Sequence, residues 1–127
     1  MNEIQIIQTQ LALEQVHFTK VAAICAAALA NDNFIRGELT RACSDYFAFA
    51  LTRVPVNATA PAADASPERW REFLQAFNEA IQQHFSALDA LLTRNLPVAE
   101  WRARSGIDAD SIFAERTLFA RVQAAVP

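Results

Sequence analysis

The chain has 127 residues, a size that predicts one domain, residues 1–127, built around one hydrophobic core. Hydrophobic residues make up 53% of the sequence and only two residues are glycine, which excludes disorder by composition and disfavours a turn-rich β-sandwich or barrel. The formal net charge of −3 provides no positive field for DNA or RNA, so we expect no nucleic-acid partner.

The cysteines and the N-terminal segment indicate a cytoplasmic protein. Cys25 and Cys43 lie in apolar segments and belong to no C-x-x-C motif, so we expect two small core residues and no disulfide framework. Residues 21–30, VAAICAAALA, resemble the core of a signal peptide, but the residues before them are amphipathic and include Glu3 and Glu14. No apolar run has the length expected of a membrane span, so we expect no membrane partner. Arginine supplies all but one of the eleven basic residues, which is typical of a GC-rich bacterial genome.

Residues 3–30 are predicted to form a long amphipathic helix. Its apolar side chains recur at spacings of three and four residues, at Ile4, Ile7, Leu11, Phe18, Val21, Cys25 and Ala28. Glu14 occupies the stripe position between Leu11 and Phe18, and His17 follows three residues later on nearly the same face. A carboxylate and an imidazole are therefore expected near the core side of this helix.

A second helix is predicted over residues 33–54, after a polar break in which Asp32 or Asn33 can cap it. Its inner face carries Ile35, Leu39, Ala42, Tyr46 and Phe49 or Ala50, with Cys43 beside them. Residues 55–65, PVNATAPAADA, have two prolines and no periodicity, and we expect a surface loop there.

The clearest helix is predicted over residues 66–94, where Ser66 can act as the cap and Pro67 suits the first turn. Its stripe consists of Trp70, Leu74, Phe77, Ile81, Phe85, Leu88 and Leu92. His84 lies three residues after Ile81, within the same stripe. Burying an imidazole nitrogen without a partner costs roughly 1–3 kcal/mol, so His84 is expected to have partners in the core.

Two further helices are predicted, a short one over 97–104 that displays Trp101 and a longer one over 109–125. Gly106 ends the first, and Asp108 or Asp110 caps the second. In the last helix Glu115 falls between Ile112 and Phe119 on the inner face, so this acidic side chain is also expected to point inward.

These elements predict an all-α fold, specifically a four-helix up-down antiparallel bundle with a short extra helix before the last long helix. In that arrangement the first and third helices run parallel, and the second and fourth run opposite to them. Counting 1.5 Å per residue along each helix, we expect Glu14, His17 and His84 at similar heights, close to Asp45 and Tyr46. Glu115 joins this polar layer only if the last helix starts high in the bundle.

Three interpretations of the polar layer stay open at this point. The side chains can satisfy one another or a buried water and serve only to fix the register of the helices. They can instead lie at the edges of their stripes and reach solvent. Alternatively they form a site for a metal or a small molecule, in which Glu14, His17 and His84 are the metal ligands and Tyr46, Asp45 and Glu115 are supporting residues of a cofactor site.

The metal interpretation depends on Glu14-Gln15-Val16-His17, an E-x-x-H sequence of the kind that di-iron carboxylate bundles use twice. It occurs once here, because the residue three before His84 is Ile81. In its layout the chain resembles a hemerythrin or a ferritin-like bundle, with an incomplete ligand set. The cofactor that this resemblance implies is iron or another divalent metal.

We therefore expect a small, soluble, non-enzymatic interaction or regulatory protein. A domain this rich in aromatic residues often uses surplus apolar surface on a partner, which would be a second copy of the chain in a homodimer or another protein. The alternative is a metal- or small-ligand-binding bundle.

Overall fold

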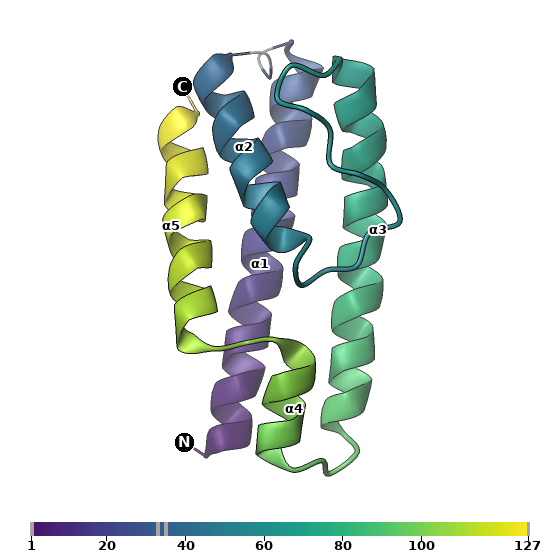
Figure 1. Cartoon of the computed structure of the whole chain (residues 1–127), viewed down its shortest axis with the longest axis vertical. Coiled ribbons are helices and arrows are strands. Elements are labelled where there is room, and N and C mark those ends of the chain that lie inside the picture. The colour runs from purple at the N-terminus through teal and green to yellow at the C-terminus, as the bar shows by residue number, and fades with distance from the viewer. Residues whose placement is uncertain (1, 33, 35, 127) are drawn as a thin grey trace.

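The computed structural model describes residues 2–32, 34 and 36–126, and all the regular secondary structure in this part of the chain is helical (Figure 1). The helices are α1 (Glu3–Ala30), α2 (Gly37–Ala50), α3 (Pro67–Leu92), α4 (Val98–Ser105) and α5 (Ala109–Ala125). They pack side by side in a bundle-like arrangement, with α4 at the end of the molecule that holds the start of α1. The predicted all-α class is confirmed.

Most helix starts follow from their caps. The side chain of Asn2 accepts a hydrogen bond from the backbone N–H of Gln5, and the side-chain oxygen of Gln5 accepts one from the backbone N–H of Asn2, which forms a capping box for α1. Ser66 accepts from the backbone N–H of Arg69 at the start of α3. Asp108 caps α5 by accepting a hydrogen bond from the backbone N–H of Ser111; it is one of the two caps predicted, Asp108 or Asp110.

The second helix is shorter than predicted at both ends. The residue before α2 is Arg36, whose side chain makes no capping hydrogen bond, so Asp32 does not cap this helix, and Asn33 lies outside the described residues. Phe34 is buried instead, and its carbonyl oxygen accepts a hydrogen bond from the hydroxyl of Thr40. Burial of this aromatic side chain sets where the chain enters α2.

A tight turn closes α2 and directs the next residues back toward the core. The backbone N–H groups of Arg53 and Val54 both donate to the carbonyl of Ala50, at 3.0 and 2.8 Å. Val54 is fully buried. Helix α2 therefore ends four residues before the predicted end at 54, and the turn, not a helical face, positions Arg53.

The direction of α3 differs from the prediction. Arg71, near the start of α3, donates to the carbonyl of Leu29 at the end of α1, whereas Phe85, late in α3, lines a cavity together with Leu11 from the first half of α1. Helices α1 and α3 are therefore antiparallel, and the expected parallel pairing is wrong. The segment between α2 and α3 returns along the bundle, so both helices start at the same end of the molecule (Figure 1).

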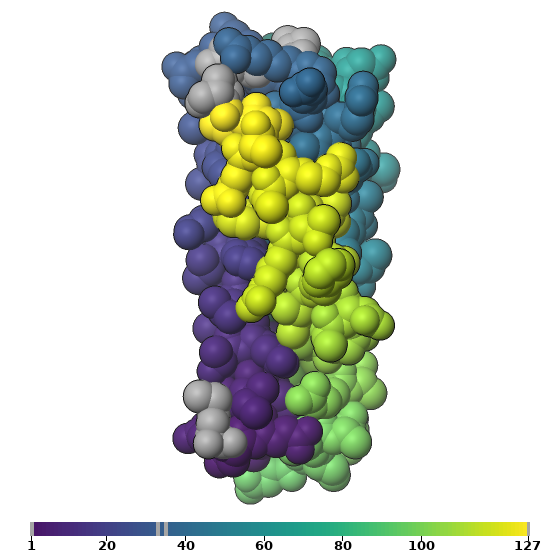
Figure 2. Space-filling view, turned by 90° about the vertical axis from the view of Figure 1, so that its left-hand side faces the viewer, coloured from purple at the N-terminus to yellow at the C-terminus, as the bar shows by residue number. Residues whose placement is uncertain are grey.

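Helix α5 lies against α1 and α2. Figure 2 shows α5 beside α1 on one face of the molecule, and the contacts between His17 and Glu115 confirm this placement. On its other side α5 packs antiparallel to α2, where Arg121 pairs with Asp45. This packing brings the middle of α1, the end of α2 and the first half of α5 together.

The core consists of interlocking aromatic rings from α1, α2 and α3. Phe47 packs edge-to-face on Phe73 and Phe77, with ring centroids 5.2 and 4.8 Å apart, and Phe18 makes similar contacts with Tyr46. These side chains are fully buried. Cys25 and Cys43, also buried, are free thiols.

The length and apolar composition of helix α1 have a consequence that the sequence analysis missed. Among the described residues it is the one helix long and apolar enough, by length and composition, to cross a membrane, a test that soluble core helices and signal sequences also pass. Its buried side chains belong to the core: Ile7, Leu11, Glu14, Phe18, Val21, Ala22, Cys25 and Leu29. The prediction that no apolar segment has the length of a membrane span is therefore wrong for α1.

Candidate functional site

Four polar side chains meet where α1, the turn after α2 and α5 come together. They are Glu14 and His17 from α1, Arg53 from the turn and Glu115 from α5. The side chains of Glu14 and Glu115 are each 3% exposed and that of Arg53 is 5% exposed, so three charge-bearing side chains are buried here. Glu14 and Glu115 occupy the stripe positions predicted for them, and α5 does start high enough to bring Glu115 to the level of His17.

Arg53 is the centre of this cluster. One guanidinium nitrogen pairs with Oε1 of Glu14 and lies 3.9 Å from Oε2 of Glu115, and the other donates to the carbonyl of Gly106 at 2.8 Å. The guanidinium also lies over the ring of Phe49, 5.4 Å from its centroid. One positive charge therefore serves two buried carboxylates, and it joins the end of α2 to the segment between α4 and α5.

His17 and Glu115 form the second contact of the cluster. Nδ1 of His17 lies 3.0 Å from Oε1 of Glu115, and the imidazole ring stacks on Phe119 with a centroid distance of 4.6 Å. Burial raises the pKa of Glu115 to about 8, although the charges of Arg53 and Arg116 act in the opposite direction. Burial also lowers the pKa of His17, and the charges of Arg116 and Lys20 lower it further. At neutral pH the imidazole is therefore neutral and Glu115 binds a proton.

Several buried polar atoms of the cluster have no hydrogen-bond partner among the described residues. They are Oε1 of Gln10, Oε2 of Glu14, Nδ1 of His17 and Oε1 of Glu115. The close approach of the last two does not have the geometry of a hydrogen bond. All four residues line one cavity of about 110 Å³ between α1 and α5, which Leu13, Ile112 and Arg116 complete. The unpaired groups thus share one space.

The remaining predicted site residues lie elsewhere. His84 is half-buried on α3, beside Phe85, and does not line the cavity, and burial, followed by the charge of Arg53, lowers its pKa. Asp45 is exposed and pairs with Arg121 at 2.8 Å on the surface. Tyr46 is buried with an unpartnered hydroxyl, and burial raises its pKa, with the nearby charge of Glu115 adding to the effect. The structure brings together Glu14, His17 and Glu115 only.

The cluster does not present a ready metal site. Within the part of the chain that the structure describes, no three His, Cys, Asp or Glu side chains are grouped closely enough to hold a metal ion. In addition, the guanidinium of Arg53 already pairs with one oxygen of Glu14 and would repel a metal cation there. The acceptor groups that face the cavity suit a ligand that donates hydrogen bonds.

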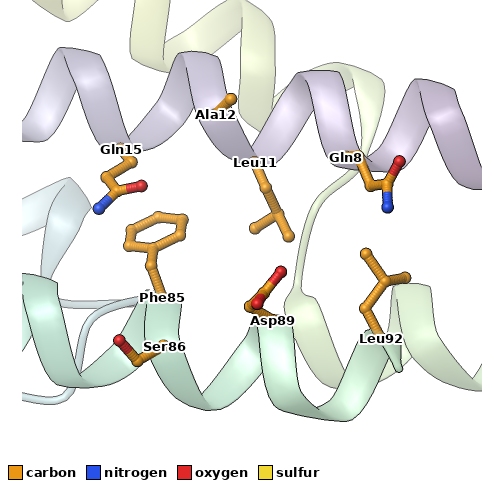
Figure 3. A pocket seen from close by; sticks show the side chains of 8 residues that line it. All are labelled: Gln8, Leu11, Ala12, Gln15, Phe85, Ser86, Asp89 and Leu92. Atoms are coloured by element: carbon orange, nitrogen blue, oxygen red, sulfur yellow. The ribbon is translucent and has the colours of Figure 1, made fainter. Parts of the chain in front are cut away.

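A second cavity, of about 280 Å³, lies in the groove between α1 and α3. Figure 3 shows the side chains of α1 and α3 facing one another across this groove, with Leu11 opposite Asp89, Gln15 opposite Phe85 and Gln8 opposite Leu92. Its polar side chains are partly or fully exposed and can be hydrated by bulk solvent. It lacks the buried, unpartnered groups that distinguish the cavity between α1 and α5.

The sequence analysis missed Arg53 and Gln10. Arg53 lies seven residues after Tyr46 and three after Ala50, so it continues the inner stripe of the second helix. Two carboxylates on inner faces also require a positive partner, which was a second signal. Comparison with protein-family models, with curated proteins and with solved structures finds no match for this chain.

Proposed function

We propose that this domain is a non-enzymatic binding protein that holds a small polar ligand in the cavity between α1 and α5. The observation that supports this function is the set of four unpartnered polar atoms on residues that line the cavity. A buried polar group without a partner costs roughly 1–3 kcal/mol, so a fold that gathers several of them around one space is completed by something that bonds to them.

The chemistry of the lining residues favours an organic ligand over a metal ion. The sequence predicted iron or another divalent metal held by Glu14, His17 and His84, but His84 does not line the cavity. A dication would also lie close to the guanidinium of Arg53, which already neutralises part of the carboxylate charge. A ligand of low charge avoids this repulsion.

The two histidines provide the test. Each histidine gives its own imidazole NMR signals. A ligand in the cavity should shift the signals of His17, which lines the cavity, more than those of His84. A fragment library screened in this way should yield binders that the Glu115→Gln variant loses and that the control Glu79→Gln, at an exposed position on α3, retains. Elemental analysis of protein purified without chelators tests the metal alternative. If only ordered water is found in the cavity and no fragment shifts His17, the polar cluster serves the fold alone.

A second candidate function is protein association, in which the chain is an interaction or regulatory protein that forms a homodimer or binds another protein. The ring of Phe113 on α5 is 74% exposed, and Ile6 and Leu13, seven residues apart on one side of α1, are 38% and 43% exposed. Large aromatic side chains in contact with water are typical of interfaces, where their burial stabilises the complex.

Association is tested by sedimentation equilibrium over a range of protein concentrations. A dimer that uses these residues should dissociate more readily in the Phe113→Ser variant, whereas Ile4→Ser, an exposed position on another side of α1, should have little effect. A mass equal to the monomer at all concentrations, together with no partner retained by immobilised protein, would remove this candidate.

We also propose a cytoplasmic location. Eight buried residues of α1 pack into the core, so removal of this helix as a signal peptide, or its insertion into a bilayer, would leave the rest of the domain without one wall. Fractionation of cells that express the tagged protein, followed by sequencing of its N-terminus, tests this proposal.

A further inference from the structure

The unpartnered atoms of the cavity are hydrogen-bond acceptors. The side-chain oxygens of Gln10 and Glu14 accept, the carboxylate of Glu115 accepts once it is ionised, above about pH 8, and Nδ1 of a neutral imidazole accepts as well. A ligand with N–H groups satisfies such a set, whereas a carboxylate or phosphate ligand would add further acceptors and be repelled. The acceptors therefore select the donor character of the ligand.

From this arrangement we infer that the cavity binds a short primary alkylammonium ion, an inference that rests on the ligand-binding function proposed above. A protonated primary amine has three N–H donors, enough to satisfy three of the four acceptors. Its single positive charge offsets the negative charge that Glu14 and Glu115 carry in excess of Arg53 when both are ionised.

The charges around the cavity decide between a monocation and a dication. Arg53 pairs with Glu14 and lies near Glu115, so even with both carboxylates ionised a dication would leave a surplus positive charge in the core. Arg116 also lines the cavity and opposes any cation, but this residue is exposed and its charge is screened by solvent. The buried carboxylates are screened much less, and a single ammonium group balances them.

The size and the walls of the cavity limit the rest of the ligand. A volume of about 110 Å³ corresponds to a few water molecules, each of which takes about 30 Å³ in the liquid. The cavity therefore accommodates an ammonium group with one to three carbon atoms. Leu13 and Ile112 provide an apolar wall for the alkyl chain.

The experiment is a titration with methylammonium and ethylammonium chloride at pH 9 and constant ionic strength, observed through the imidazole NMR signals of His17. At this pH Glu115, whose pKa is about 8, is ionised, whereas the amines, like a lysine side chain, still carry their charge. At the ceiling of about −1.5 kcal/mol per heavy atom, methylammonium can reach a Kd of roughly 5–10 mM and ethylammonium one on the order of 1 mM, and NMR measures both. We expect saturable shifts of His17 with both amines and none with tetramethylammonium, which has the charge but no N–H donor.

Two variants with a control locate the binding. Glu115→Gln should weaken binding about tenfold or more, because it removes a charged acceptor. Glu79→Gln, at an exposed position on α3, should leave the Kd unchanged. If Glu115→Gln does not unfold cooperatively, and so is not properly folded, Gln10→Leu at a half-exposed position takes its place. This variant should weaken binding by about twofold to tenfold.

The possible results test the ammonium assignment and the proposed ligand-binding function separately. Equal shifts with tetramethylammonium, or binding of acetate or a divalent metal at His17 without binding of the amines, would overturn the ammonium assignment and leave the proposed ligand-binding function in place. If neither the amines nor any member of a chemically diverse fragment library shifts His17, both proposals fail.

Discussion

Removal of Arg53 should be among the most destabilising single substitutions in this protein. Its guanidinium pairs with Glu14, lies 3.9 Å from Glu115 and donates to the carbonyl of Gly106. Arg53→Met keeps much of the side-chain volume but leaves a buried carboxylate without its positive partner. Breaking a buried pair in this way costs about 3–5 kcal/mol, and the lost hydrogen bond to Gly106 adds about 1 kcal/mol.

The assay is urea denaturation at neutral pH, followed by far-ultraviolet circular dichroism. With a slope of about 2 kcal/mol/M, a loss of about 4 kcal/mol lowers the midpoint by about 2 M urea. Arg121→Met is the matched control, because Arg121 pairs with Asp45 where both side chains are about half exposed, at 47% and 48%. Exposed pairs contribute about 0–1 kcal/mol, so the control should shift the midpoint little.

The double variant Glu14→Leu/Arg53→Met identifies the cause. Replacing both partners of a buried ion pair with apolar side chains is often neutral or stabilising, so the double variant should recover most of the lost stability. If Arg53→Met costs no more than Arg121→Met, or if the double variant is less stable than Arg53→Met alone, the buried charge is not what makes Arg53 important and the reasoning is wrong.

Three further predictions concern stability. Because burial raises the pKa of Glu115 from 4.5 to about 8, the folded state keeps a proton that the unfolded state loses, so this stabilisation is complete below about pH 4.5 and is lost as the pH rises through about 8. Unfolding free energies measured across this range should show a smaller decline for Glu115→Gln than for the wild type. His84→Leu should leave the stability unchanged or raise it. The NMR signals of His17 should still respond to ligand in this variant, because His84 lies outside the cavity. Loss of that response would show that His84 belongs to the site. Gly106→Ala should destabilise the fold by about 1–2 kcal/mol, since φ at Gly106 is +70°. Gly37→Ala, at the first residue of α2, should instead stabilise it by about 0.4–1 kcal/mol. Thermal unfolding tests both, and a change in stability of the same sign for the two variants would contradict this reasoning.

The polar cluster illustrates how far helical periodicity reaches. Glu14 and Glu115 were expected to point inward because each occupies a stripe position between two apolar residues, and both are buried. His84 met the same criterion on α3 but is only half-buried, beside Phe85. Periodicity indicates the side of a helix that faces the core, but it does not say which neighbouring helix covers that side.

The sequence alone determined the helical class, most helix ends and the inward direction of the two carboxylates, because these depend on residues close together in the chain. Caps and periodicity act over a few residues, so the ends of α1 and the starts of α3 and α5 followed from them. The late start and the early end of α2 did not follow, because the burial of Phe34 before this helix and the turn at Arg53 after it are set by other helices.

Only the tertiary structure decided the direction of α3 and the composition of the site. The segment between α2 and α3 is long enough to return to the end where α2 starts, and neither length nor composition shows whether it does so. That path places α3 antiparallel to α1 and leaves α5 to cover Glu14 and His17. Arg53 joins Glu14 across thirty-nine positions in the chain: the local pattern could indicate that Arg53 points inward, but only the packing of the helices determines that Glu14 is its partner.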